Sequence, residues 1–321
     1  MENEEKRRLF RRDDDRPDLQ PEDTTPNLSF FFKLLKRKFG KVMTLNLFML
    51  FQVLPIVACI PIYVYAATFA TMESPVYAPL LGAYLTGRSP TAGLLLSVLG
   101  GQINVPQLST WRLALIAVLV AFLALTWGWQ NVGSFYNLRS LVRGDSCFLF
   151  SDYFYAIRRN LKRGFFFGLF DFVFLFLIGF DLYTLYQMAG ALQYGIMYML
   201  ALVIGILYLI MRPYLYLMLV TFDLSFRKRM KNGLLLLVLG TKRNAMLALG
   251  TVIVAGSNLA LIILCLKVGF TLPIILPFFY LLPLEGFMAT YAAWPVIKQY
   301  MIDPVDEEEG QTKTPTPPTA D

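Results

Sequence analysis

The chain has 321 residues, 56% of them hydrophobic, and a mean hydropathy of +0.54. Because the apolar residues lie in long blocks and do not alternate with polar ones, this composition excludes an ordinary soluble domain and predicts a multi-pass membrane protein. The absence of histidine excludes histidine-ligated metals and catalysis by Ser-His-Asp or Cys-His groups.

Both ends of the sequence are polar. Residues 1–27 alternate acids and bases without an apolar run, which predicts a disordered charged arm and not a signal peptide. Residues 303–321 combine the acids at 306–309 with Thr-Pro repeats, which predicts a disordered acidic tail. Residues 28–302 are expected to form the membrane domain.

Six apolar segments in this domain reach the length of about 20 residues that a membrane helix needs. They are Val42 to Phe69, Leu113 to Val132, Phe165 to Met188, Gly195 to Val220, Met246 to Leu266 and Val268 to Ala292. The predicted fold class is therefore an all-α membrane protein with six transmembrane helices arranged as three hairpins.

Three basic clusters predict the orientation of these hairpins. Lys33–Lys41, Arg158–Arg163 and Arg227–Arg243 each precede a pair of apolar segments. Because Lys and Arg near span ends stay on the cytoplasmic side, both termini are expected inside, at the cytoplasmic membrane. A net charge of +7 is also found in nucleic-acid-binding proteins, but these cations lie next to spans. Anionic lipids of the inner leaflet, and not nucleic acid, are therefore the expected partner.

Residues 70–111 separate the first two predicted spans. They are rich in proline and glycine, which break regular structure, and nearly free of charge. We expect an outer loop with a short interfacial or re-entrant helix, which serves either as a structured cap or as a substrate-facing lid.

The basic clusters belong to an internal repeat. Ser29–Lys41 resembles Ser151–Arg163, and a weaker third copy places Lys242–Asn244 over Arg158–Asn160. We expect each hairpin to be preceded by a basic amphipathic helix that lies in the cytoplasmic interface. The predicted apolar faces are Leu28, Phe32, Leu35 and Phe39 in the first copy, Phe150, Phe154, Ile157 and Leu161 in the second, and Phe226, Met230 and Leu237 in the third.

Several of these segments carry a family resemblance. The residues concerned are Asn46-Leu47, Leu54–Val57, Gly133–Asn137, Leu138–Asp145, Phe154, Arg159–Lys162, Arg212–Tyr214 and Phe222–Ser225. In them the chain resembles the YesL-like family of bacterial integral membrane proteins, over most of its length outside the two tails. The resemblance implies no established biochemical activity, and for some members an accessory part in carbohydrate uptake or polysaccharide utilisation. The long outer segment departs from the family pattern.

The most specific part of this resemblance is the basic connector that leads from the second span to the third. It contains Arg139, Arg143, Gly144, Arg158, Arg159 and Asn160. The resemblance makes these residues family-like positions and assigns them no chemical role.

Three ionisable residues fall inside predicted spans at a similar depth, roughly 10 to 12 Å from the cytoplasmic ends at about 1.5 Å per residue. They are Asp171, Arg212 and Glu285. Because an isolated charge in a membrane is expensive, we expect them to form an intramembrane charge cluster. The cluster can be structural and fix how the spans pack, or it can be a polar substrate or proton site on a transport path. Asp181 lies nearer the outer end, where water can reach it.

No catalytic motif accompanies these features. Cys59, Cys147 and Cys265 are too far apart in the sequence for a metal motif, and no cofactor is expected. An enzyme is therefore not expected. Two functions stay open: an accessory or scaffold protein associated with a solute-uptake system or the cell envelope, and a transporter or permease subunit for a small polar solute that uses the charge cluster.

Overall fold

The computed structural model describes residues 27–64, 109–188 and 191–304, together with residues 82–83, 86–87, 90–91 and 95. Residues 27–51 and 124–304 belong to one compact unit, called the main unit below, and the described residues from Gln52 to Leu123 belong to a second. Nearly all of the predicted charged arm and acidic tail, and most of the predicted outer loop, lie outside the described residues.

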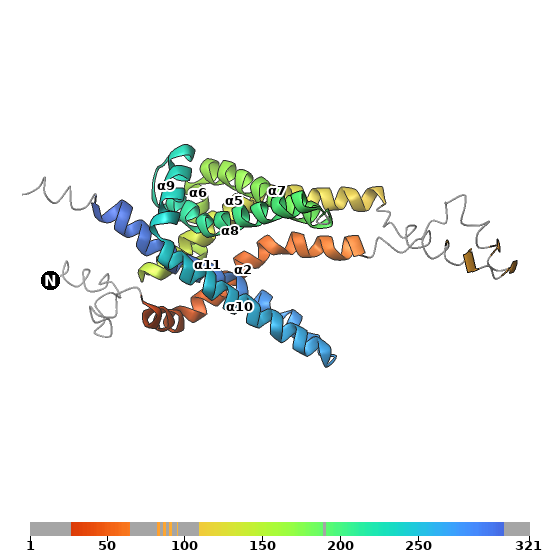
Figure 1. Ribbon diagram of the computed structural model, residues 1–321. Coiled ribbons are helices and arrows are strands. Elements are labelled where there is room, and N and C mark those ends of the chain that lie inside the picture. Colours follow the sequence, from red (N-terminus) through yellow and green to blue (C-terminus); the bar gives the residue numbers. More distant parts are fainter. Residues whose placement is uncertain are drawn as a thin grey trace, which may run out of the picture. The chain divides into compact units, whose positions relative to one another are not determined.

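Every described element is helical, as the composition predicts (Figure 1). In chain order the elements are α2 (Leu28–Val64), α5 (Thr110–Arg143), α6 (Leu149–Arg159), α7 (Leu161–Gln187), α8 (Leu192–Thr221), α9 (Phe226–Leu239), α10 (Thr241–Lys267), the 3₁₀ turn η3 (Leu272–Ile274), α11 (Leu276–Ile297) and the π turn η4 (Lys298–Ile302).

Five of the described helices, α2, α5, α7, α8 and α10, are long and apolar enough to cross a membrane. The chain therefore has the architecture of a multi-pass membrane protein. Helix α11 is shorter, at 22 residues, and contains Glu285 and two internal prolines. It is not among the five, so the sixth span stays a prediction.

The sixth predicted span begins later than the sequence indicates. Gly269 ends α10 in a left-handed conformation with φ of +77°. Its N–H bonds to Leu266 and the next N–H, of Phe270, bonds to Cys265, which together satisfy the free carbonyls of the helix end. Helix α11 then starts at Leu276 with Pro277 in its first turn, where a missing N–H costs nothing.

The second and third copies of the repeat have the same architecture. In each copy a short helix is followed by a single residue and a helix of 27 residues: α6, Asn160 and α7, then α9, Gly240 and α10. Asn160 therefore corresponds to Gly240. The predicted match of Asn160 with Asn244 was wrong by one helical turn, because Lys242 to Asn244 form the first turn of α10.

The first copy contains no separate amphipathic helix, contrary to the prediction. Helix α2 continues from Leu28 through the basic cluster into the apolar segment as one helix of 37 residues. Its first internal proline is Pro55, and Gly40 is the basic cluster's single glycine, so nothing there breaks the helical hydrogen bonds.

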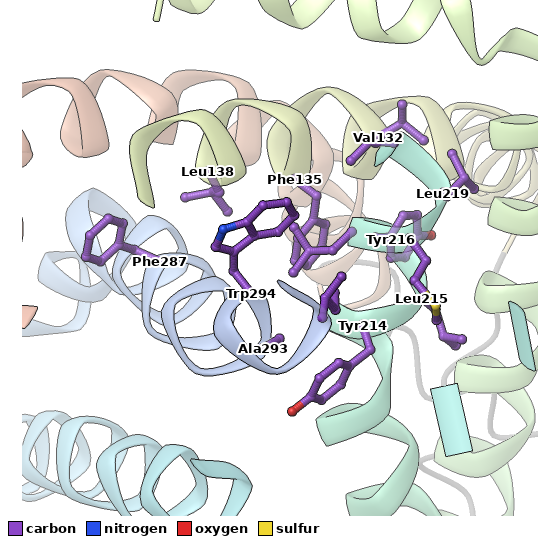
Figure 2. Packing of buried hydrophobic residues seen from close by; sticks show 14 of the residues in the cluster. Val132, Phe135, Leu138, Tyr214, Leu215, Tyr216, Leu219, Phe287, Ala293 and Trp294 are labelled. Carbon is purple, nitrogen blue, oxygen red and sulfur yellow. The ribbon is translucent and has the colours of Figure 1, made fainter. Parts of the chain in front are cut away.

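The core of the main unit surrounds the end of α8. Every residue from Tyr214 to Leu219 is at most 2% exposed. Side chains from α5 and α11 join this cluster, among them Phe135 and Trp294 (Figure 2). The ring of Phe135 stacks on Tyr216 with centroids 5.3 Å apart. This end of α8 is thus the best-packed part of the molecule that the structure describes.

Helices α5 and α7 approach each other through glycine. A Cβ atom added to Gly128 or to Gly168 would overlap backbone atoms of the other helix. Gly164 and Gly168 form a small-xxx-small pair, the pattern that allows membrane helices to pack backbone to backbone. The contact brings Trp127, next to Gly128, close to the part of α7 that carries Asp171.

Candidate functional site: a buried carboxylate in the helix bundle

Asp171 is the centre of a hydrogen-bonded cluster between three helices. Its carboxylate is fully buried. Oδ1 accepts hydrogen bonds from the hydroxyl of Tyr208 at 2.6 Å and from Nε of Arg212 at 3.1 Å. Oδ2 accepts from Nε1 of Trp127 at 2.8 Å, from the hydroxyl of Tyr216 at 2.7 Å and from Nε of Arg212 at 2.9 Å. Two predicted members of the charge cluster, Asp171 and Arg212, therefore form an ion pair.

A second layer of contacts fixes the guanidinium of Arg212. Its other end donates to Oδ1 of Asn131 at 2.7 Å, and Asn131 in turn donates to the carbonyl of Trp127 at 2.8 Å. The guanidinium also lies over the rings of Trp127 and Tyr216, with centroid distances of 5.5 and 5.0 Å. Cation–π contacts of this kind are strongest when desolvated. The Arg212 side chain is 18% exposed, so it is held on most of its surface.

Helical periodicity explains how these residues meet. Tyr208, Arg212 and Tyr216 recur every four residues, which places them on one face of α8. Trp127 and Asn131 have the same spacing on α5. The charge of Arg212 predicts its place in the cluster, whereas the two tyrosines, the tryptophan and the asparagine are uncharged and were not predicted as members. Polar side chains at four-residue intervals within an apolar helix are the sequence pattern that would have predicted these members of the cluster.

This geometry leaves the carboxylate of Asp171 no free lone pair to accept a further hydrogen bond. An ionised carboxylate offers about four lone-pair positions, and here four donor side chains occupy both oxygens. No part of Asp171 reaches solvent, so a substrate or a passing proton would have to displace an existing partner. The cluster has the properties of a packing device: paired, fully bonded and shared by α5, α7 and α8.

Glu285, the third predicted member, has a different partner. The hydroxyl of Thr251 on α10 donates to Oε2 of Glu285 at 2.7 Å. The other oxygen, Oε1, is buried and has no hydrogen-bond partner among the described residues. Within the described part of the chain Glu285 bonds to neither Asp171 nor Arg212, so the similar depth predicted for the three residues does not bring them together.

Helix α11 is also tied to α2 near this point. Pro283 has no N–H to donate to the carbonyl of Phe279. The side-chain amide of Asn46 replaces it, donating to the carbonyls of Phe279 at 2.8 Å and of Phe278 at 2.7 Å. A side chain of α2 thus satisfies the carbonyl that Pro283 leaves without its helical hydrogen bond.

The basic connector contains one deeply buried cation. Arg139 is 9% exposed, and its guanidinium donates to the carbonyl of Val220 at 3.1 Å and to the hydroxyl of Thr221 at 2.9 Å. Arg229 of α9 acts similarly, donating to the carbonyl of Leu224 just beyond α8. Burial, with Arg163 nearby, lowers the pKa of Arg229 to about 10. Both arginines place positive charge at the negative, carboxyl end of α8.

The other connector positions have local structural roles or lie on the surface. Arg143 pairs with Asp145 at 3.2 Å, and Gly144 ends α5 in a left-handed turn with φ of +83°. Asn160 is buried between α6 and α7, and its amide donates to the carbonyl of Ala156 at 3.0 Å. Arg158 and Arg159 are exposed on α6. The connector is therefore brought to one end of the main unit without forming an enclosed site.

Contacts at this end involve two of the three basic clusters. Lys41 of α2 donates to the carbonyl of Cys147, and Arg163 of α7 pairs with Asp223 beyond α8. Arg139 joins the ends of α5 and α8, as described above. The carboxyl ends of α5 and α8 and the amino end of α7 therefore share one basic end of the main unit.

The predicted apolar faces have different surroundings in the three copies. On α9 the predicted face packs on the main unit, because Phe226 contacts the rings of Phe167 and Phe170 while Met230 and Leu237 pack against the core. On α6 the buried residues are Tyr153 and Ala156, whereas Phe150 and Phe154 are more than half exposed. This second apolar face of α6 is only partly covered, by the ring of Phe48 of α2, which lies 4.8 Å from that of Phe150 and 6.4 Å from that of Phe154. In the first turns of α2 the buried residues are Phe31 and Leu34, and Leu35 of the predicted face is partly buried against the core, whereas Phe32 is 59% exposed.

The cysteines do not form a reactive or metal-binding group. Cys147 is buried and donates its thiol to Oδ1 of Asn137, and burial is the main cause that raises its pKa to about 12. Among the described residues no group of three His, Cys, Asp or Glu side chains could hold a metal ion.

Comparisons of the chain with protein-family models, with curated proteins and with solved structures found no match. The resemblance to the YesL-like family therefore rests on the residues quoted above alone.

Proposed function

We propose that this chain is a non-catalytic accessory or scaffold protein of the cytoplasmic membrane, associated with a solute-uptake system, such as one for carbohydrates, or with the cell envelope. The observation that carries the proposal is the closed state of the Asp171 cluster. A transport site must exchange partners with its substrate, whereas this carboxylate is fully buried and bonded on both oxygens. The strongest charged cluster of the described residues is thereby used for packing.

The exposed surface supports the same proposal. Helix α6 combines the cations Arg158 and Arg159 with exposed Phe150 and Phe154. A short helix of this composition is suited to the interface of an anionic membrane or to a partner's apolar groove. With the basic end facing the cytoplasm, as the distribution of Lys and Arg favours, α6 and α9 would be available to the cytoplasmic parts of an uptake complex.

The test is purification of a tagged full-length chain from its native membrane in mild detergent, with mass spectrometry of every co-purifying protein. Stoichiometric permease, solute-binding or ATPase subunits are the expected result. A matched variant, Phe150→Ser with Phe154→Ser, keeps the buried face of α6 and should lose those partners while keeping its yield. Recovery of the chain alone, in both forms, contradicts the scaffold proposal.

One observation favours the alternative, a transporter or permease subunit for a small polar solute. Oε1 of Glu285 is buried without a partner in the described structure, and Glu285 lies two residues after Pro283, an internal proline of α11. Kinked helices with a polar residue line binding sites in many transporters. Solute uptake into proteoliposomes by the purified chain, abolished by Glu285→Gln, would support this alternative; uptake unchanged by that variant would remove Glu285 from the route.

A further inference from the structure

A groove of about 440 Å³ opens between the amino ends of α2 and α10 and the carboxyl half of α11. Its volume lies in the range of small-molecule sites in proteins. All of its lining residues belong to the main unit. None of them belongs to the Asp171 cluster, so the groove is a second, separate feature of the molecule.

One end of the groove is cationic. Lys242 and Arg243, in the first turn of α10, both line it, with Lys242 exposed and Arg243 half-buried. Neither forms an ion pair with a described residue. Two cations in one helical turn without a described acidic partner form a favourable position for an anionic group, and phosphate is an anion that both Lys and Arg bind.

The remainder of the groove is apolar. Leu28 and Phe31 of α2, Met246 of α10 and Met288 of α11 line it. Gly250 lines it close to α11, because a Cβ atom at that position would lie 2.7 Å from Cε of Met288. A free phosphate ion would leave this apolar part empty, whereas a hydrocarbon chain would fill it.

The direction of the groove matches that of a lipid. Helix α10 is one of the five helices that can cross a membrane, and its amino end carries the two cations. Gly250 lies eight positions after Lys242, which is about 12 Å along the helix. The cations therefore lie where headgroups are found, and the apolar part extends toward the hydrocarbon region.

From this arrangement we propose that the groove binds one anionic phospholipid, with the phosphate on Lys242 and Arg243 and the first part of an acyl chain against Met246, Gly250 and Met288. General attraction between basic loops and anionic membranes would recruit many exchangeable lipids. The groove instead retains a single lipid per chain. This binding does not require the scaffold role, so either proposal can fail alone.

The experiment is native mass spectrometry of the delipidated full-length chain in detergent, titrated with phosphatidylglycerol, with phosphatidylcholine and with glycerol 3-phosphate. We expect one retained phosphatidylglycerol, weaker retention of phosphatidylcholine and no competition by glycerol 3-phosphate. Because each cation near a membrane surface contributes about fivefold, Lys242→Gln with Arg243→Gln should weaken phosphatidylglycerol binding at least tenfold. The matched control is Lys228→Gln with Lys231→Gln, which removes two exposed charges from α9 that do not line the groove.

A second variant tests the groove without changing charge. Gly250→Leu fills the apolar part and should abolish retention of the lipid, whereas Gly256→Leu, on the same helix in open space, should leave it unchanged. Equal lipid retention by both double-charge variants, or by both glycine variants, overturns the proposal. Competition by glycerol 3-phosphate would show a soluble phosphate ligand instead.

Discussion

Two carboxylates of the main unit, the fully buried Asp171 and the half-buried Glu285, have different surroundings. Asp171 accepts hydrogen bonds from four side chains of α5 and α8. Glu285 accepts one, from Thr251 of α10, and its Oε1 has no partner among the described residues. Because a buried charge is stable only when it is paired and hydrogen-bonded, the first carboxylate holds helices together while the second adds little to packing. Position within a span thus says less about a charge than the donors that surround it.

The largest effect is expected from breaking the helix contact that positions Asp171. In Gly168→Leu the side chain would have to occupy space taken by the backbone of α5 at Gly128, which no rotamer change can relieve. We expect most of the monodisperse protein to be lost on size exclusion in mild detergent. Gly179→Leu, on the same helix but with open space around it, is the control and should behave like the unmodified chain. Similar yields of the two variants would show that α5 and α7 do not pack through glycine.

The second largest effect is expected from removing one partner of the ion pair. Arg212→Ala leaves the carboxylate of Asp171 buried and uncompensated, which costs about 3–5 kcal/mol. Arg227→Ala, which removes an exposed cation from α9, should cost less than about 0.5 kcal/mol. Thermal unfolding of the purified variants, followed by intrinsic fluorescence, measures the difference. Equal midpoints would mean that the Asp171 cluster does not stabilise the bundle.

A smaller effect is expected from the hydroxyl groups of the cluster. Tyr216→Phe removes one hydrogen bond to an ionised acceptor and keeps the ring that stacks on Phe135, so it should cost about 1.5–3 kcal/mol. Tyr183→Phe on α7, where the ring is 67% exposed, is the control. In a double-mutant cycle Tyr216→Phe should cost less once Arg212 is Ala, because both residues serve the same carboxylate. Additive effects would place the two side chains in separate interactions.

The parts of this structure that depend on local composition could be predicted from the sequence. Long apolar blocks predict α7, α8 and α10 because hydrophobicity and length alone decide whether a helix can cross a membrane. The ends of α10 and α11 were harder, since the stop at Gly269 is a single left-handed residue within a continuous apolar run. The same limit applied to the repeat, where one helical turn separates the predicted position at Asn244 from the observed one at Gly240.

The candidate site was predictable only in part, because counting residues gives the depth of a charge in a span but not the direction in which its helix turns it. The depths of Asp171 and Arg212 predicted their pairing. Glu285 has a similar depth, but its helix turns it toward Thr251. The buried faces of α2 and α6 were missed for the same reason: each helix has two apolar faces, and packing selected Phe31 and Tyr153 over Phe32 and Phe154. The Tyr208, Arg212 and Tyr216 stripe would have given the rotation of α8.

The smallest effect on stability is expected at Glu285, and it tests the comparison between the two carboxylates directly. Glu285→Gln keeps the shape and an oxygen for the hydroxyl of Thr251, and it removes a buried charge that has a single neutral donor. Stability should therefore change by less than about 1 kcal/mol, or increase.

Asp171→Asn makes the same chemical change, yet it directs an amide N–H₂ at donors and leaves Arg212 without a counter-charge, so it should cost about 3 kcal/mol or more. The thermal unfolding midpoints of the two variants, measured in the same detergent, compare the two stability changes directly. Equal losses would mean that Glu285 has a partner as strong as Arg212, and a gain at both positions would mean that neither charge is needed to hold the helices together.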